Sequence, residues 1–261
     1  MDKISFAFFG STEFSKKLLL FLIDNKYIPK SIFSSPPEYS ISYSGKKIKN
    51  FNYENLNKIA KEYHLPFYEV DSVDGKRTKD FESIIKNLNL DLIIVAGWYY
   101  KMPKIIRELS KLGAWGIHAS LLPKYAGGAP LTWAIINGEK QTGVTLFKLD
   151  EGIDDGDIIS QKSFAIDEKD TIKEVYEKAT FASKEILLNA LKQINKIEYM
   201  PQDKTKIKTY PHRSPEDGEI DLGKSRDEIY NFVRAQSTPY PGAFIKTKDG
   251  KKLIIEKVRK K

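Results

Sequence analysis

The seven residues at positions 90–96 constrain the fold of this chain more than any other segment, because only Asp91 among them is polar. A strand that is apolar on both faces is typical of the centre of a parallel sheet, where helices cover both sides. The chain also alternates short apolar strands with segments of helical spacing, beginning with a strand at residues 4–9 and a helix at 13–24. Repeated strand and helix units predict an α/β fold with a mostly parallel sheet.

The remaining elements continue this alternation as far as residue 200. Further strands are predicted at residues 30–34, 66–70, 114–118, 142–149 and 157–164, and further helices at 53–63, 80–88, 103–110, from 130 onward and 171–194. Beyond residue 200 a polar stretch is followed by a short helix at 228–235 and two brief strands at 243–247 and 252–258. The sequence therefore predicts a main domain at residues 1–200 and a small α+β subdomain at residues 201–261.

The composition excludes several classes of protein. With 261 residues, 41% of them hydrophobic and 30% charged, the chain is long and apolar enough to bury a sizeable core. It contains no cysteine, which excludes disulfides, zinc–cysteine sites, iron–sulfur clusters and thiol nucleophiles. Neither a secretory signal pattern nor an apolar run of 18 residues occurs, so we expect a cytoplasmic protein without a membrane partner.

The formal net charge is +8, and most of the excess lies after residue 200, above all in the last five residues, Lys257-Val-Arg-Lys-Lys261. Such a tail can attract nucleic acid or any phosphate-bearing ligand, but a lysine-rich terminus is more often a solvated chain end. The charge alone does not decide the partner.

Gly10-Ser11-Thr12-Glu13 occupies the first turn between a strand and a helix, where α/β folds often bind phosphate. The turn lacks both the G-x-G-x-x-G pattern and the spacing of a nucleoside triphosphate loop. A dinucleotide or triphosphate site is therefore not predicted there.

His118 is more informative, because it ends a predicted strand and precedes a loop rich in proline and glycine at residues 119–130. Open α/β sheets place ligands at this edge. A second candidate is the carboxylate-rich turn at residues 150–157, which does not match the spacing of an EF-hand calcium loop. A hydrolase that uses Ser120 as nucleophile is conceivable, but the serine is not in a nucleophile elbow.

Four segments together resemble the signature of the N10-formyltetrahydrofolate-dependent formyltransferases. They are Gly116-Ile-His-Ala-Ser-Leu-Leu-Pro123, Gly127-Gly-Ala-Pro130, Thr142-Gly-Val-Thr145 and residues 150–158. The resemblance extends over residues 1 to about 200. Residues 214–221, 229–235 and 239–244 are similar to segments that follow the catalytic domain of the nucleotide-sugar N-formyltransferases, with too few residues after them for a full C-terminal barrel.

The resemblance implies a Rossmann-like catalytic domain that passes a formyl group to an amine through a negatively charged tetrahedral intermediate. His118 matches the family's catalytic histidine and would act as hydrogen-bond donor and proton carrier. Asp154 matches its aspartate, which would hold His118 in the right charge state and receive the amine proton, with Asp155 as the alternative for this role. The resemblance implies no metal.

One position departs from the family pattern, since Gly116 stands where an asparagine amide ordinarily helps to bind the oxyanion. Loss of such a donor costs about 3–4 kcal/mol elsewhere, or roughly 10²–10³ in rate. Side chains two apart on a strand share a face, so a glycine here opens a gap beside the formyl group unless another group fills it. We expect Trp115, a main-chain amide or a distant side chain to occupy the space, so that an asparagine at position 116 would clash. Three interpretations stay open: another group substitutes, the enzyme is slow, or the chain only binds its ligands.

The resemblance also implies where the two substrates bind. The cosubstrate, formyltetrahydrofolate, is expected to lie against Gly97, Trp98 and Tyr99, although these aromatic residues also suit a buried core. It is also expected to bind main-chain groups of the loop that contains Leu149, Gly152 and Ile153. The acceptor is expected near Tyr43, Lys46, Lys47, Asn52, Tyr53, Gly127 and Gly128. Lysines suit a pyrophosphate and a tyrosine can stack on a base, but a solvated loop has the same composition.

The expected function is transfer of a formyl group to the amine of a dTDP- or UDP-linked amino sugar, a precursor of O-antigen, lipopolysaccharide or another surface polysaccharide. Two alternatives remain. Methionyl-tRNA formylation suits the basic tail but not the short C-terminus, so nucleic acid is not the favoured partner. A binding protein for folate or nucleotide without turnover is conceivable because of Gly116. The sequence does not identify the sugar or the formylated position, and a homodimer is left open.

Overall fold

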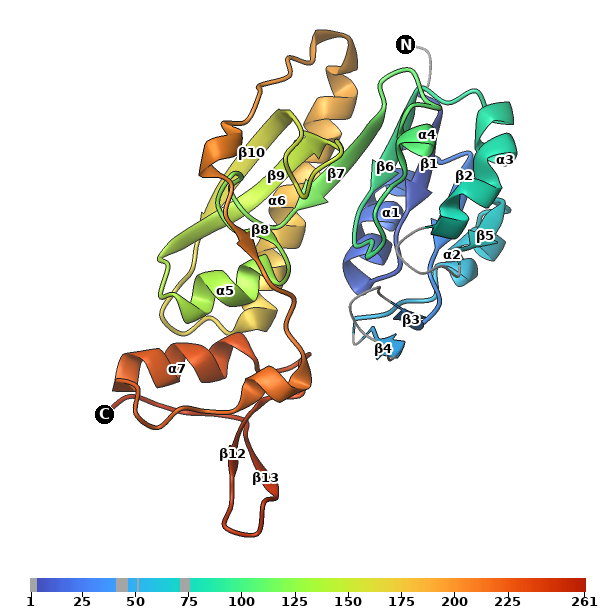
Figure 1. Cartoon of the computed structure of the whole chain (residues 1–261). Coiled ribbons are helices and arrows are strands. Elements are labelled where there is room, and N and C mark those ends of the chain that lie inside the picture. The colour runs from blue at the N-terminus through green and yellow to red at the C-terminus, as the bar shows by residue number, and fades with distance from the viewer. Residues whose placement is uncertain (1–3, 41–46, 51, 71–75) are drawn as a thin grey trace.

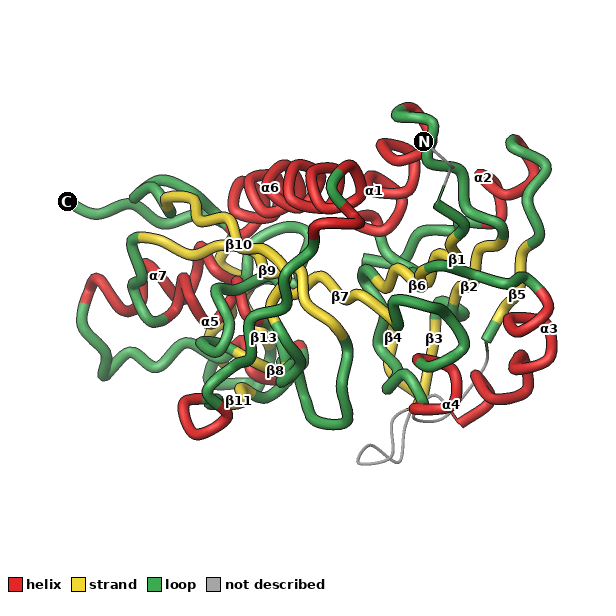
Figure 2. The backbone as a smooth tube through the Cα atoms, turned by 90° about the horizontal axis from the view of Figure 1, so that it is seen from above, coloured by secondary structure: helices red, strands yellow, loops and turns green. Residues whose placement is uncertain are grey.

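The computed structural model describes residues 4–40, 47–50, 52–70 and 76–261. Its centre is a seven-stranded sheet in the order β10-β9-β7-β6-β1-β2-β5 (Figures 1 and 2). The strands are β1 (Phe6–Phe9), β2 (Ser31–Ser34), β5 (Phe67–Glu69), β6 (Leu92–Val95), β7 (Ala114–His118), β9 (Gln141–Lys148) and β10 (Ile158–Ala165). Five are parallel, and β9 and β10 add an antiparallel edge. The predicted mostly parallel α/β sheet is confirmed.

Helices cover both faces of this sheet. One face packs against α1 (Glu13–Asp24), α2 (Asn57–Glu62), α5 (Pro130–Ile136) and α6 (Ile172–Lys192). The other packs against α3 (Glu82–Asn87) and α4 (Lys104–Arg107). Figure 2 shows α1, α2 and α6 on one side of the sheet and α3 and α4 on the other. All four residues of β6 are buried, with Leu92 and Ile94 on the first face and Ile93 and Val95 on the second. This arrangement accounts for the apolar run in the sequence.

Several elements differ from the sequence prediction. The helix predicted at residues 53–63 begins only at Asn57, because Tyr53 forms a β-bridge with Thr12 and the Glu13 amide donates to the Asn52 carbonyl. The helix predicted at 80–88 is a 3-10 turn (Lys76–Phe81) followed by α3.

Four short strands were not predicted. The polar loop after the second strand contains a hairpin of β3 (Glu38–Ser40) and β4 (Lys47–Lys49). Two further strands, β8 (Ala126–Gly127) and β11 (Thr209–Tyr210), pair in parallel.

The C-terminal region has a small core of its own, formed by Ile220, Val233 and Ala243. It consists of α7 (Arg226–Ala235) and a hairpin of β12 (Ala243–Lys246) and β13 (Lys252–Ile255), which projects from the body in Figure 1. Three 3-10 turns, Ile194–Lys196, Lys204–Lys206 and Pro215–Gly218, lie between α6 and α7. The predicted small α+β subdomain is confirmed, whereas its boundary at residue 200 stays a prediction.

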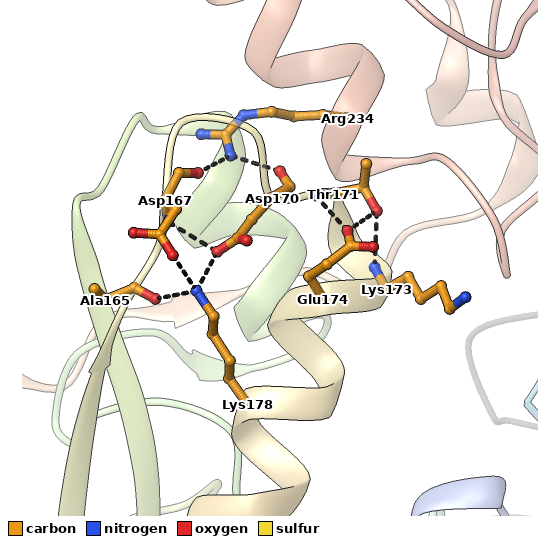
Figure 3. A network of polar contacts seen from close by, with 8 residues as sticks. All are labelled: Ala165, Asp167, Asp170, Thr171, Lys173, Glu174, Lys178 and Arg234. Carbon is orange, nitrogen blue, oxygen red and sulfur yellow. Dashed lines mark hydrogen bonds and ion pairs between the residues drawn. The ribbon is translucent and has the colours of Figure 1, made fainter.

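A polar network joins α7 to the turn between β10 and α6 (Figure 3). Arg234 Nη1 donates to the main-chain oxygens of Asp167 at 3.2 Å and Asp170 at 2.7 Å. Lys178 Nζ lies 2.6 Å from a carboxylate oxygen of each of the same two aspartates. The turn is therefore held by one cation from the subdomain and one from α6. Among the described residues, no helix is both long and apolar enough to cross a bilayer.

Candidate active site

His118 ends β7 and is buried, with 9% of its surface exposed. Its Nε2 lies 2.7 Å from the main-chain oxygen of Tyr125. Since a carbonyl oxygen only accepts, we assign a hydrogen to Nε2. Nδ1 is then the ring nitrogen at which a proton can be taken up or released.

Asp154 faces that nitrogen from the loop between β9 and β10. Its Oδ2 lies 3.4 Å from Nδ1 of His118 and accepts a hydrogen bond of 2.8 Å from the Gly127 amide. The loop begins beside the start of β7, where the Leu149 amide donates to Ala114, and it reaches the other end of that strand at Asp154. The structure thus brings together the predicted pair, while the carboxylate of Asp155 instead binds Lys204 at 2.9 Å and the Gly152 amide at 3.1 Å.

Gln202 holds the Asp154 loop and was not predicted from the sequence. Its Nε2 donates to the carbonyl oxygens of Asp154 at 2.9 Å and Gly156 at 2.7 Å. Asp154 has a φ of +52°, a left-handed backbone that is uncommon outside glycine. The amide of Gln202 therefore ties down a strained residue from a segment 48 positions away.

His212 is a second residue that the sequence did not single out. It follows β11. A Cβ added at Gly128 would lie 2.8 Å from Cγ of His212, so the ring packs against the loop after His118. Gly127, in the same loop, binds Asp154. Desolvation lowers the pKa of His212, and the carboxylate of Asp154 acts in the opposite direction. The sequence offered two signals that could have drawn attention to His212: the chain has three histidines, and this one directly precedes Arg213.

The space beside Gly116 is filled. A Cβ at this position would lie 2.7 Å from Cδ2 of Leu149 and 3.0 Å from Cε1 of Phe147, the residue paired with Gly116 in β9. Two apolar side chains from the neighbouring strand and loop therefore occupy the space, and not Trp115 or a main-chain amide. Neither side chain supplies a hydrogen-bond donor in place of an asparagine amide.

A cavity of about 420 Å³ lies behind the Asp154 loop, between that loop, α4 and the start of β7. Arg107, with only 9% of its side chain exposed, donates from Nη1 to the Leu149 carbonyl at 3.1 Å and lies 3.6 Å from Asp150. The Glu151 amide and the cations of Lys204 and Arg107 lower the pKa of Asp150. Both main-chain groups of Leu149, which we expected at the folate edge, are thus engaged within the protein.

The other residues predicted for folate lie on two segments. At the end of β6, Gly97 has a φ of +64° and its carbonyl accepts from the amide of Ser11 at 3.1 Å. Trp98 stacks edge-on against Phe9, with 5.4 Å between ring centroids, and its buried Nε1 has no partner among the described residues. Tyr99 donates to Asn50 at 3.3 Å.

In the Asp154 loop the side chain of Ile153 is 60% exposed, and Gly152 lies against the Asp155 carboxylate, where a Cβ would meet an oxygen at 2.4 Å. The loop therefore presents an apolar side chain beside Asp154. A glycine is needed at position 152 because Asp155 folds back over it.

The residues predicted for the acceptor are only partly placed. Tyr43 and Lys46 lie outside the described residues, and Lys47 is described as part of the β4 backbone. Asn52 lies beside α1 and hydrogen bonds to the hydroxyl of Tyr240 from the C-terminal region. Burial raises the pKa of Tyr53, helped by the nearby Glu69 and Glu54.

Gly127 and Gly128 use their amides inside the protein. The Gly127 amide binds Asp154, and the Gly128 amide donates to the Tyr210 carbonyl at 2.8 Å. Gly127 has a φ of +89°, and a Cβ would lie 2.6 Å from the same Tyr210 carbonyl. These glycines allow the linker at residues 209–212 to lie directly on the loop after His118.

Two sequence alternatives find no support in the geometry. The Ser120 hydroxyl is fully buried and donates to the Lys124 carbonyl at 2.6 Å, which does not suit a nucleophile. In the first strand-to-helix turn, the amides of Ser11 and Thr12 both donate to Oγ of Ser15, at 3.1 and 3.0 Å. They are not directed at a phosphate.

The imidazole of His118 and the carboxylate of Asp154 lie at the carboxyl end of a strand, where open α/β sheets place their ligands. The formyl transferase model matches residues 27–191, and the model of the formyl transferase C-terminal domain matches residues 213–261. The chain therefore belongs to the formyl transferase family and is a formyl-transferring enzyme. The predicted family is confirmed.

Relatives of two kinds resemble the chain. It is 39% identical over 209 residues to the bifunctional polymyxin resistance protein ArnA of Wigglesworthia glossinidia brevipalpis, covering 78% of this chain and 31% of that protein. It is 33% identical to a methionyl-tRNA formyltransferase of Thermodesulfovibrio yellowstonii, over 95% of this chain and 78% of the relative. The fold resembles an N-formyltransferase of Helicobacter canadensis solved with folinic acid and dTDP-3-aminofucose, with a TM-score of 0.65, 22% identity and coverage of 89% and 80% of the two chains.

Proposed function

We propose that the enzyme transfers a formyl group from N10-formyltetrahydrofolate to the amine of a nucleotide-linked amino sugar. The observation that carries this proposal is the pair formed by His118 and Asp154, whose facing atoms are 3.4 Å apart at the carboxyl end of β7. Transfer of a formyl group between two nitrogens needs a group that removes a proton from one and supplies a proton to the other. A histidine with one free ring nitrogen beside a carboxylate supplies both functions.

In this mechanism the chain works through three contacts. The Tyr125 carbonyl fixes the ring of His118, and Asp154 stabilises the imidazolium that forms when Nδ1 takes up a proton. The Gly127 amide holds the carboxylate in place by donating to the same oxygen, Oδ2. When the acceptor nitrogen has bonded to the formyl carbon, Nδ1 removes a proton from it and returns one to the departing donor nitrogen.

One feature at the end of β6 suits a folate ring. The buried Nε1 of Trp98 offers a donor without a partner among the described residues. The cavity of about 420 Å³ does not carry this assignment, because it lies at the start of β7, at the opposite end of that strand from His118.

Two observations support a nucleotide sugar as the acceptor. The Helicobacter canadensis enzyme, which shares the fold, was solved with folinic acid and dTDP-3-aminofucose. In addition, part of the basic tail is engaged, because Lys260 forms ion pairs with Glu168 at 3.1 Å and Asp227 at 3.0 Å. Methionyl-tRNA formylation is the second candidate, and the 33% identity over nearly the whole chain favours it.

The test is to incubate the purified chain with N10-formyltetrahydrofolate and, separately, dTDP-amino sugars, UDP-amino sugars and methionyl-tRNA. Formylated products are detected by mass spectrometry. We expect formylation of at least one amino sugar. Formylation of methionyl-tRNA alone would replace the proposed function by the second candidate, and folate binding without any product would indicate a binding protein.

A charge variant separates the two acceptors independently. Lys257 and Arg259 are exposed and form no ion pair among the described residues, so Lys257→Gln with Arg259→Gln removes two charges without breaking the contacts of Lys260. The matched control is Lys192→Gln with Lys196→Gln at the end of α6. A tRNA acceptor would bind the first variant more weakly than the control, with a smaller salt dependence, whereas a nucleotide sugar would not distinguish them.

A further inference from the structure

His212 occupies a position at the site that the roles of His118 and Asp154 leave unexplained. His212 is an exposed residue, yet its backbone and the Cγ atom of its ring lie against Gly128. A Cβ added at Gly128 would lie 2.4 Å from the main-chain nitrogen of His212 and 2.8 Å from its Cγ. The segment is fixed on both sides of the histidine. The Gly128 amide binds the Tyr210 carbonyl at 2.8 Å, and Nε1 of Trp133 donates to the Pro211 carbonyl at 3.0 Å.

The surroundings of the ring are almost uncharged. The segment at residues 127–133 that packs against it contains no titratable side chain. Asp154 is the charged group that acts on the ring from the catalytic loop. The neighbouring Arg213 is turned away, with its guanidinium 4.8 Å from the ring centre of Trp133 and Nη2 bonded to Gln236 at 3.0 Å.

Both nitrogens of the His212 ring are without a hydrogen-bond partner in the described part of the chain. Asp154 uses Oδ2 for the Gly127 amide and for His118, and its Oδ1 is a further acceptor in this part of the site. A base that must accept a new proton needs a free lone pair, and at this edge of the site His212 offers one.

We propose that His212 is a second catalytic base, which takes a proton from the ammonium form of the acceptor before the amine attacks. The inference rests on the proposed formyl transfer. A primary amine is largely protonated at neutral pH and has no lone pair in that state. Transfer of one proton to the imidazole gives a neutral amine and an imidazolium, which the Asp154 carboxylate stabilises.

The remaining protons then balance. The amine lone pair bonds to the formyl carbon, and the π electrons of its carbonyl move to oxygen. A second proton leaves the nitrogen for Nδ1 of His118 and passes to the donor nitrogen as its bond to the formyl carbon breaks. His212 releases the first proton to solvent, which its exposed position allows.

The first experiment does not depend on turnover. The imidazoles of His64, His118 and His212 are titrated by NMR in the wild-type chain and in Asp154→Asn. We expect the midpoint of His212 to fall in the variant, because the carboxylate favours the charged ring, while the exposed His64 is unchanged. A His212 midpoint that does not move would overturn the influence of Asp154 on His212, and with it the proposal.

The second experiment compares His212→Asn with His64→Asn in assays with N10-formyltetrahydrofolate and the best amino-sugar acceptor. At pH 7 we expect His212→Asn to lower kcat/KM by about 10², within the usual range for acid–base groups. The loss should shrink to about threefold or less above the pKa of the acceptor amine, where no base is needed.

His64→Asn should match the wild type at every pH. A loss in His212→Asn that is the same at all pH values would show a structural role and overturn the proposal. Absence of formyl transfer by the wild-type chain would instead overturn the proposed function, and with it the acceptor that His212 would serve.

Discussion

Nε2 of His118 and the carbonyl oxygen of Tyr125 lie 2.7 Å apart, and this contact determines which nitrogen of the ring can exchange a proton. Tyr125 is itself held by its surroundings. Its hydroxyl donates to Glu139 at 2.8 Å, its ring stacks on Tyr210, and desolvation is the largest of the effects that raise its pKa to about 12. The tyrosine therefore stays uncharged at physiological pH and keeps its carbonyl in place.

Replacement of His118 by asparagine should abolish most of the activity and leave the fold intact. We expect formyl transfer to fall by about 10²–10⁴, because the ring nitrogen that faces Asp154 at 3.4 Å is lost. Turnover and folate affinity are measured together, with His64→Asn as the control. Near wild-type turnover in a folded His118→Asn enzyme that binds folate would contradict the assigned role.

Gly116→Asn should lower activity rather than restore a missing donor. The new side chain would meet Leu149 and Phe147, and overpacking of this kind destabilises a core by about 1–3 kcal/mol. The double variant Gly116→Asn with Leu149→Ala should recover part of the stability, because it removes the nearer of the two contacts. Thermal unfolding and turnover are compared with Leu149→Ala alone. A tenfold gain in turnover for Gly116→Asn would refute this prediction.

Gln202→Ala should impair catalysis without removing any group that we expect to touch a substrate. Without its two hydrogen bonds the loop can shift Asp154 away from His118, and a displacement of about 1 Å costs on the order of 10² in rate. We expect the loss in kcat to exceed the change in KM. Gln193→Ala, in an exposed residue after α6, is the control. Unchanged kcat in Gln202→Ala would show that the loop holds its geometry unaided.

The start of α6 should make stability depend on pH. The Thr171 side chain accepts from the Lys173 amide at 3.3 Å, and Oε2 of Glu174 accepts from the Thr171 amide at 2.8 Å (Figure 3). The hydrogen bond from the Thr171 hydroxyl is the main reason that the pKa of Glu174 is lowered. A lowered pKa means that the charged carboxylate favours the folded state, so its contribution is present at neutral pH and lost as the pH falls below about 4.

Thr171→Ala should therefore lower the free energy of unfolding at pH 7 by about 1 kcal/mol, the usual effect of losing an N-cap. Glu174→Gln should also be less stable than the wild type at pH 7, and the two should converge in acid. Chemical denaturation between pH 3 and 7 measures both. A difference between Glu174→Gln and the wild type that is constant over this range would exclude the stated cause.

Local pattern was sufficient to predict β7 and its final residue. Residues 114–118 are apolar up to a histidine, and both ends of the predicted strand agree with the structure. The pairing of His118 with Asp154 followed from the resemblance to a family and is consistent with the observed contact. The central strand β6 was equally predictable, because it is buried on both faces and its residues reflect this directly.

The contacts made by the linker were not predictable from the sequence. β8 and β11 have two residues each, too few for any periodicity, and they pair over 83 positions. Gln202 and His212 lie in a polar stretch that resembles any exposed connection. The filling of the space beside Gly116 depends on where Leu149 lies after β9, which only the packed structure determines.

The pairing of β11 with β8 has a consequence for the synthesis of the protein. His118 and Asp154, the proposed catalytic pair, are made early, but the segment that covers Gly127 and Gly128 lies more than 80 residues after these two glycines in the chain. During translation the large sheet can form while the linker is still inside the ribosome. The nascent chain would then have its fold before it has an active site, and it would acquire formyl transfer only once residues 202–212 have emerged and docked.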